Sequence, residues 1–167
     1  MNKLISGSRK WLLLIIIAVI VFTADQVTKQ LVIESIPLNT GIEVISGFFD
    51  LAHVRNPGVA FGMMSGSAWS FQRTFFILLS LAAMAAVLWV IYSSAGIELG
   101  LLAGYCLFFG GALGNLIDRV RFGEVIDFID VHWGNVHWPA FNVADSALCV
   151  GASLFLIHFI FKKNNES

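Results

Sequence analysis

Two aspartates, Asp127 and Asp145, stand in settings that suit acid–base chemistry. Asp127 lies between Ile126 and Phe128, and apolar neighbours raise the pKa of a carboxyl group. Asp145 follows Asn142 by three residues at the start of an apolar segment, so their side chains share one face of a helix that begins there. Two carboxyl groups that face each other share one proton. The ionised group then activates water against a carbonyl carbon, while the protonated group hydrogen-bonds to the carbonyl oxygen.

Further ionisable and amide side chains stand within or beside apolar segments. A carboxylate at mid-bilayer costs about 2.5–3.5 kcal/mol on insertion scales, so such groups usually face a bundle interior and serve a function. Asp25 and Lys29 are spaced i, i+4 with the acid first, which favours an ion pair on one helical face. Asn115, Asp118 and Arg119 are spaced i, i+3 and i+4 and share one face of another helix.

Purely structural interpretations of these residues stay open. Asp25 and Lys29 neutralise each other, or reach interfacial water by extending along the helix. Asn142 caps a helix N-terminus, and Asp145 interacts favourably with the dipole of the same helix.

Other chemistries have weaker support. The serines lack a histidine base at a recognisable spacing, and His53, His132 and His137 form no HExxH or comparable metal motif. Cys106 and Cys149 form no CxxC pair and are interpreted as packing residues. A net charge of −1, without a basic stripe, a zinc finger or a Gly-rich phosphate loop, excludes nucleic acid as a partner. We therefore expect no metal and no cofactor.

The composition indicates that these residues are held within a membrane. Hydrophobic residues make up 57% of the 167 residues and charged residues only 13%. A spanning helix needs about 20 apolar residues, and four segments are long enough, at 11–33, 71–92, 97–117 and 142–161. The expected fold is an all-α integral membrane protein with four transmembrane helices. The absence of a long linker or internal repeat indicates one domain over residues 1–167.

The orientation in the membrane follows from the basic residues at the chain ends, because cytoplasmic segments carry the excess of Lys and Arg. These residues are Lys3, Arg9, Lys10, Lys162 and Lys163. Both termini are therefore expected in the cytoplasm, with outer loops at 34–70 and 118–141 and a tight inner turn at 93–96. The basic, then apolar N-terminus also fits a signal peptide, but no convincing small-x-small cleavage site follows.

The first outer loop contains two strand-like segments, Glu43–Ile45 and Phe48–Val54, separated by Ser46 and Gly47. This pattern predicts a small hairpin, which we expect to rest on the bilayer surface. Residues 55–58 are typical of a turn, and residues 59–64 form an apolar stretch directed back toward the lipid.

Five segments, in this order, resemble the motifs of bacterial lipoprotein signal peptidase, also called signal peptidase II. They are DQVTK at 25–29, RNPGVAFG at 55–62, GALGNLIDR at 111–119, EVIDF at 124–128 and FNVADS at 141–146. Each is weak alone, but the ordered set is highly specific and covers most of the chain.

The resemblance implies an aspartic endopeptidase of the bacterial cytoplasmic (inner) membrane with its active site near the outer face. It implies removal of signal peptides from diacylglyceryl-modified prolipoproteins, with cleavage before the lipidated cysteine, by a catalytic pair formed by Asp127 and Asp145. The implied partners are these substrates and membrane lipid, and we expect a monomer. The family's other polar positions, implied to support the pair or position substrate, correspond here to Asp25, Lys29, Asn56, Asn115, Asp118, Arg119 and Asn142.

Asp118 is the rival to Asp127, because it lies in the most recognisable motif. We expect its neighbour Arg119 to hold it ionised in a salt bridge instead. Val59 stands where the family usually has alanine, and Asp50 where asparagine is frequent. Neither belongs to the expected pair, so both bear only on the shape of the substrate groove.

Two other classes of function were considered. A proton-coupled membrane carrier needs acids distributed across the bilayer, whereas here they collect near the outer side, and four spans without a repeat leave little room for alternating access. A non-catalytic membrane scaffold predicts that Asp127→Asn and Asp145→Asn leave function intact.

Overall fold

The computed structural model describes residues 4–58 and 67–165. It contains four long helices, α1 (Ser8–Ser35), α2 (Ser67–Ser93), α3 (Leu99–Phe122) and α4 (Val143–Asn165). Each is long and apolar enough to cross a membrane, which confirms the four predicted spans, and each extends beyond the predicted range at one or both ends. The predicted apolar stretch at 59–64, which includes Val59, lies outside the described residues.

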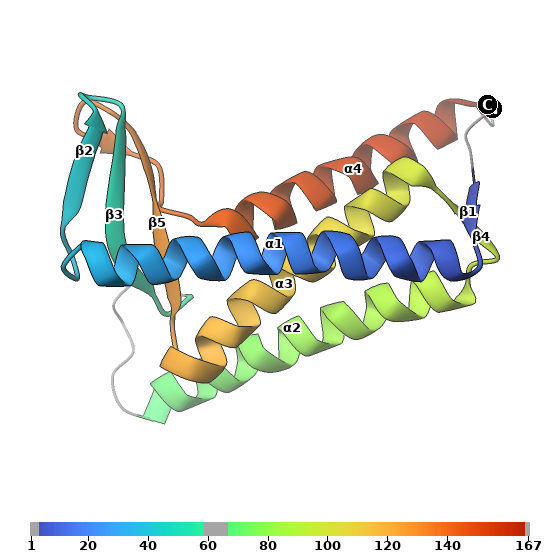
Figure 1. Ribbon diagram of the computed structural model, residues 1–167, viewed down its shortest axis with the longest axis horizontal. Coiled ribbons are helices and arrows are strands. Elements are labelled where there is room, and N and C mark those ends of the chain that lie inside the picture. Colours follow the sequence, from blue (N-terminus) through green and yellow to red (C-terminus); the bar gives the residue numbers. More distant parts are fainter. Residues whose placement is uncertain (1–3, 59–66, 166–167) are drawn as a thin grey trace.

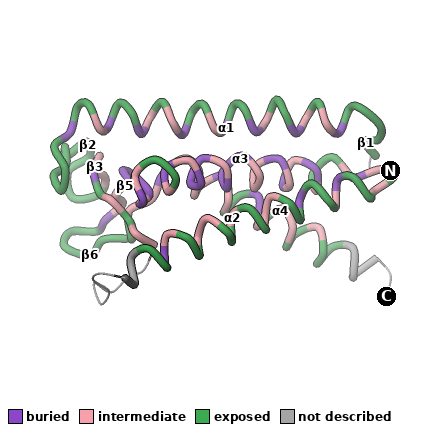
Figure 2. Tube along the Cα trace, turned by 90° about the horizontal axis from the view of Figure 1, so that it is seen from below, coloured by how far each residue is buried: buried purple, intermediate pink, exposed green. Residues whose placement is uncertain are grey.

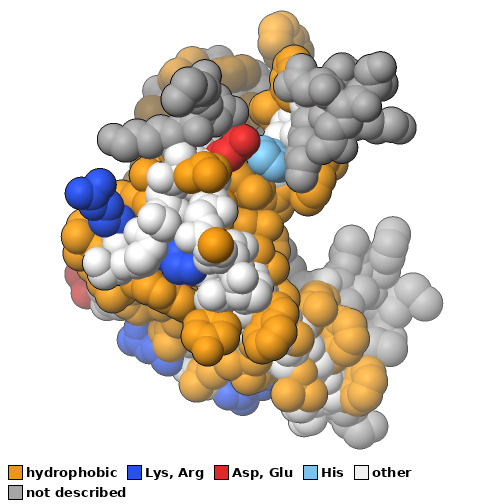
Figure 3. Space-filling model, turned by 90° about the vertical axis from the view of Figure 1, so that its right-hand side faces the viewer, with side chains coloured by type: hydrophobic (Ala, Val, Ile, Leu, Met, Phe, Trp, Pro, Cys, Tyr) orange, Lys and Arg blue, Asp and Glu red, His pale blue; other side chains and the backbone are white. Residues whose placement is uncertain are grey.

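Helix α3 is the centre of the bundle, and the other three helices pack against it (Figure 1). Half of its spanning part is buried, against 22% for α1, 11% for α2 and 17% for α4. Figure 2 shows the same contrast, with buried residues concentrated along α3. The outer helices therefore present most of their surface to lipid, and hydrophobic side chains also cover much of the end seen in Figure 3.

Small residues on α3 allow its neighbours to approach closely, as the spacing of Gly110 and Gly114 predicts. Both of these glycines face α1, and a Cβ atom on Gly114 would lie 2.6 Å from the Asp25 Oδ2 atom. Gly111 faces α4, where a Cβ atom would lie 2.4 Å from the carbonyl oxygen of Ala144. The backbone of α3 thus touches the segments that carry the candidate site.

An antiparallel sheet lies at one end of the bundle, where α1 and α3 end and α4 begins (Figure 1). Its strands are β2 (Gly41–Ile45), β3 (Phe49–Asn56), β5 (Val125–Trp133) and β6 (Val136–His137), in the order β2-β3-β5-β6. The predicted hairpin of β2 and β3 is confirmed.

The second outer loop is more ordered than the sequence analysis indicated. Helix α3 continues five residues past the predicted end at 117, to Phe122, and stops at Gly123, whose φ of 82° is the left-handed conformation that glycine adopts at helix ends. Strand β5 then pairs with β3, with Val54 opposite Asp127. The strand was not predicted because the acids in this segment are typical of a loop, although its other residues are mostly β-branched or aromatic.

The opposite end of the bundle carries a smaller sheet, in which β1 (Leu4–Ser6) pairs with β4 (Gly96–Glu98). The predicted tight turn at 93–96 therefore leads directly into a strand. Buried Lys10 donates hydrogen bonds to the carbonyl oxygens of Ile91 and Ser94 and so closes the C-terminal end of α2. The start of α1 and the end of α4 both lie at this end (Figure 1).

Candidate active site

Asp127 is buried in β5, with only 2% of its surface exposed. Asn142 Nδ2 donates to Asp127 Oδ1 at 2.7 Å, and Asn56 Nδ2 donates to Asp127 Oδ2 at 2.8 Å. Burial raises the pKa of Asp127 from 3.8 to about 6; the charge of Asp145 adds to the rise, and the two amide hydrogen bonds oppose it. Asp127 is therefore the acid of the site that takes up a proton near neutral pH.

Asp145 lies in the first turn of α4 and is half-buried. The backbone N–H of Asp145 donates to Asn142 Oδ1 at 2.8 Å, and the backbone N–H of Asn142 donates to Asp145 Oδ2 at 3.3 Å. This reciprocal pair confirms Asn142 as the predicted cap of the helix. Asp145 Oδ1 also accepts a 2.7 Å hydrogen bond from Asn115 Nδ2. Asn142 thus contacts both candidate acids, Asp127 through its amide nitrogen and Asp145 through its amide oxygen and backbone.

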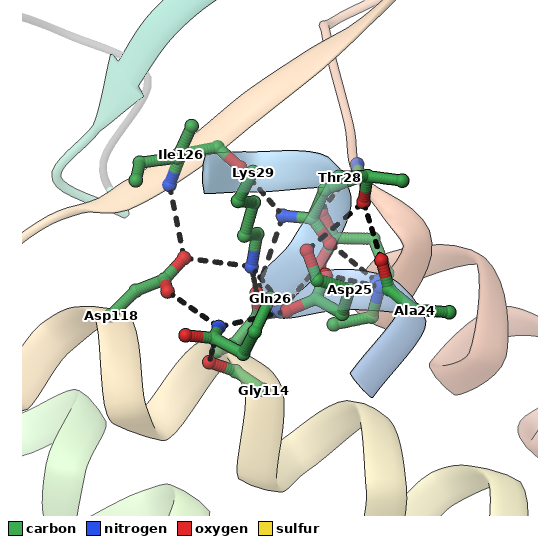
Figure 4. A network of polar contacts seen from close by, with 12 residues as sticks. Ala24, Asp25, Gln26, Thr28, Lys29, Gly114, Asp118 and Ile126 are labelled. Carbon is green, nitrogen blue, oxygen red and sulfur yellow. Dashed lines mark hydrogen bonds and ion pairs between the residues drawn. The ribbon is translucent and has the colours of Figure 1, made fainter. Parts of the chain in front are cut away.

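The predicted ion pair between Asp25 and Lys29 is present, with 2.8 Å between Lys29 Nζ and Asp25 Oδ2. Lys29 Nζ also lies 2.7 Å from Asp118 Oδ2 (Figure 4). It donates to Asn115 Oδ1 at 3.1 Å. Asp118 is therefore held in a salt bridge, as expected of a structural residue. Its partner is Lys29 and not Arg119, because adjacent residues on a helix point in different directions.

Arg119 has other contacts. Its Nη1 atom donates to the carbonyl oxygen of Asn115 at 3.3 Å, and its guanidinium group lies 5.0 Å from the ring centroid of Phe76. Asp145 and Asp127 both attract its charge electrostatically. Arg119 thus provides a positive charge beside the two candidate acids.

Comparison with known proteins identifies the family of this chain. Residues 17–161 match the family described as signal peptidase (SPase) II. The chain belongs to the signal peptidase II family. It is 43% identical over 157 residues to the lipoprotein signal peptidase of Desulforapulum autotrophicum, covering 94% of this chain and 97% of that one. It is 44% identical over 145 residues to that of Syntrophotalea carbinolica, covering 87% and 89%.

Solved structures agree with the fold of this signal peptidase II. One, described as a bacterial membrane enzyme, superposes with a TM-score of 0.81 at 34% identity and covers 100% of this chain and 96% of that chain. A second structure, also described as a bacterial membrane enzyme, superposes with a TM-score of 0.77 at 37% identity and covers 87% of this chain and 91% of that chain. The protein is therefore an aspartic peptidase and a multi-pass membrane protein, as the sequence motifs imply.

Two residues that the sequence analysis did not select also belong to the polar network of this signal peptidase II. Gln26 Nε2 donates to Asp118 Oδ1 at 2.9 Å and to Asp25 Oδ2 at 3.2 Å. Arg73, on α2, donates to the carbonyl oxygens of Arg119 and Val120 at the end of α3. Gln26 lies inside the first motif, between Asp25 and Lys29, so its role could have been predicted from the sequence. Nothing in the sequence near Arg73 indicated that it contacts the end of α3.

Asp50, one of the two departures from the commoner family pattern, lies in the sheet. Its Oδ1 atom is 3.3 Å from His132 Nε2, and Asp50 stands opposite Asp130 across β3 and β5. It therefore links two strands of the sheet.

The described parts of the chain contain no group of three or more His, Cys, Asp or Glu side chains that could hold a metal ion.

Proposed function

We propose that this signal peptidase II removes signal peptides from diacylglyceryl-modified prolipoproteins, cutting before the lipidated cysteine with Asp127 and Asp145 as its catalytic pair. The observation that carries the proposal is that Asn142, where β5 meets the start of α4, donates to both carboxylates, from its side-chain amide to Asp127 and from its backbone N–H to Asp145. Asp118, the rival acid, is held in an ion pair with buried Lys29. Asp127 and Asp145 accept hydrogen bonds from amide groups only, and neither forms an ion pair within the described residues.

The proposed reaction needs one proton on the pair. Asp127, with its raised pKa, carries this proton, and ionised Asp145 takes a proton from the attacking water. As the water oxygen bonds to the scissile carbon, Asp127 gives its proton to the carbonyl oxygen, which forms a neutral diol. Asp145 then protonates the leaving nitrogen while Asp127 recovers a proton from the diol, and the carbon–nitrogen bond breaks. The pair ends in its starting protonation state.

The surroundings of Asp145 favour its role as the base. It accepts N–H hydrogen bonds from Asn115 and Asn142, and it stands in the first turn of α4, at the positive end of the helix dipole. The nearby Arg119 attracts both acids and is placed to stabilise negative charge that develops during the reaction.

The proposed setting is the bacterial cytoplasmic membrane, with the sheet on the outer face and both termini in the cytoplasm. All of the groups above come from one chain, which is compatible with a monomer. The gathering of Asp25, Asp118, Asp127 and Asp145 around the start of α4 supports a peptidase over a carrier, whose acids would follow a path across the bilayer.

The test replaces each acid by its amide. Asp127→Asn and Asp145→Asn should each lower turnover of a lipidated prolipoprotein by about 10³-fold or more, because each removes an acid–base step. The measurement is the mobility shift of the cleaved substrate with purified enzyme, beside circular dichroism of each variant. Asp130→Asn is the matched control, because this acid lies in the same strand but contacts His137. A turnover rate of Asp127→Asn or Asp145→Asn within tenfold of the wild-type rate would contradict the assignment of the catalytic pair.

A further inference from the structure

The buried cation Lys29 contacts residues that support the two proposed catalytic acids. Lys29 is 2% exposed, and its Nζ atom contacts both Asp25 and Asp118, which are themselves fully buried. Lys29 has no contact with Asp127 or Asp145 among its hydrogen bonds and ion pairs within the described residues. Its charge lowers the pKa of Asp127 from a distance, and its effect on the positions of the two acids passes through its partners.

The two carboxylates that Lys29 holds each bind one particular backbone amide. Asp25 Oδ1 accepts the N–H of Ala144 at 2.9 Å, and Ala144 immediately precedes Asp145. Asp118 Oδ2 accepts the N–H of Ile126 at 3.2 Å, as Figure 4 shows, and Ile126 immediately precedes Asp127. The partners of Lys29 thus fix the backbone directly before each member of the proposed pair.

A third contact acts through a side chain. Lys29 Nζ donates to Asn115 Oδ1, so the amide nitrogen of Asn115 must point the other way, where it donates to Asp145 Oδ1. Without the lysine, Asn115 Oδ1 keeps only the longer, 3.3 Å hydrogen bond from Asn142 Nδ2 among its contacts in the described residues, so the amide of Asn115 is held less firmly.

We propose that Lys29 is a positioning residue that sets the separation of Asp127 and Asp145 through Asp25, Asp118 and Asn115. The inference rests on the proposed function, since it concerns the same pair. Helix α1 supplies two of the four groups in the cluster, although it carries neither acid of the pair. The cluster therefore couples the position of β5 to the position of the start of α4.

This arrangement predicts a specific kinetic effect. A displacement of about 1 Å at a reacting group costs on the order of 10²-fold in rate. Since Lys29 is buried away from the substrate, its loss should lower kcat and leave KM nearly unchanged. Lys29→Met also removes a positive charge that lowers the pKa of Asp127, so that pKa should rise and the alkaline limb of the pH–rate profile should move to higher pH.

The experiment compares two buried lysines of the same helix, Lys29→Met and Lys10→Met, in the purified full-length enzyme with lipidated prolipoprotein. Lys10 donates to carbonyl oxygens at the C-terminal end of α2 and lies over the Trp11 ring, at the end of the bundle away from the pair, so its loss affects folding but not the pair. We expect kcat of folded Lys29→Met to fall about 100-fold with KM within about threefold, and the alkaline limb of the pH–rate profile to move to higher pH. Lys10→Met should keep the wild-type kcat, when the rate is divided by the concentration of folded enzyme, and the wild-type position of the alkaline limb.

Either of two results overturns the proposal: kcat of folded Lys29→Met within threefold of wild type, or a KM that rises by as large a factor as kcat falls. If Lys29→Met does not fold, Asp118→Asn decides by the same kcat and KM readouts, because its amide oxygen can still accept the Ile126 N–H while the ion pair with Lys29 is lost. A failure of the proposed function is distinguishable, since Asp127→Asn and Asp145→Asn would then remain active.

Discussion

At the scale of single residues, three asparagines determine which carboxylate oxygens receive a hydrogen bond. The amide oxygen of each accepts a fixed donor, namely the N–H of Gly58 for Asn56, Lys29 Nζ for Asn115 and the N–H of Asp145 for Asn142. Each amide nitrogen must then point to an acid: Asn56 and Asn142 donate to Asp127, and Asn115 donates to Asp145. The orientation of these amides is thus set by the fold before substrate binds.

The Asn56 hydrogen bond provides a prediction about pH dependence. This bond lowers the pKa of Asp127, so Asn56→Ala should raise that pKa above about 6 and move the alkaline limb of kcat/KM upward by about one pH unit. The sign follows because the reaction needs Asp127 protonated. The measurement is the pH profile of kcat/KM, with exposed Asn135→Ala in the β5–β6 turn as control. If the alkaline limb of kcat/KM stays in place or moves to lower pH in Asn56→Ala, then Asn56 does not lower the pKa of Asp127.

Local spacing explains which of these residues could be predicted. The Asp25–Lys29 pair and the Asn142 cap join residues that are three or four apart, so the helical repeat alone indicates them. The contact between Lys29 and Asp118 joins two helices, and only their packing decides it. The expected Asp118–Arg119 pair was wrong because adjacency in sequence does not bring two side chains together on a helix.

At the scale of elements, the approach of α4 to α3 places Asp145. Glycines at this interface allow backbone contact, and Gly111 lies directly against Ala144, the residue before Asp145. The span lengths could be predicted because apolarity and length are local properties. Strand β5 was harder to predict than the spans. It pairs with β3, which is distant in sequence, and its acidic residues are more typical of a loop than of a strand.

Gly111→Ala should therefore damage both stability and activity. Its Cβ atom would meet the Ala144 carbonyl oxygen at 2.4 Å, so α4 must move, at a cost of about 1–3 kcal/mol for overpacking. We expect a lower midpoint of thermal unfolding and a kcat at least tenfold lower, measured with purified enzyme. Gly100→Ala, in the same helix with open space around its Cβ position, should be neutral or stabilising by up to about 1 kcal/mol. Equal behaviour of the two variants would argue against this packing role.

At the scale of the whole molecule, the two ends of the bundle differ in kind. One end carries the larger sheet and the polar network, and the other carries the small β1–β4 sheet with the start of α1 and the end of α4 (Figure 1). The sequence predicted this division, because four spans place both termini on one side. The extent of the larger sheet was not predictable from the hairpin alone.

The proposed orientation can be checked by cysteine labelling in intact cells. Asn135→Cys, in the exposed β5–β6 turn, should react with a membrane-impermeant maleimide added outside. Ser93→Cys, exposed at the other end of the bundle, should react only after the membrane is permeabilised. The background is the protein in which Cys106 and Cys149 are replaced by alanine. The reverse pattern would invert the proposed topology.

The central claim is that Asp127 and Asp145 hold one proton between them, and an infrared titration of their carboxyl groups tests it most directly. We expect a protonated-carboxyl band in the wild-type enzyme that disappears with a midpoint near pH 6 and is absent in Asp127→Asn. In Asp145→Asn the same band should titrate at lower pH, because the neighbouring charge that raises the pKa of Asp127 is gone. A midpoint that is identical in wild type and Asp145→Asn would contradict the shared proton.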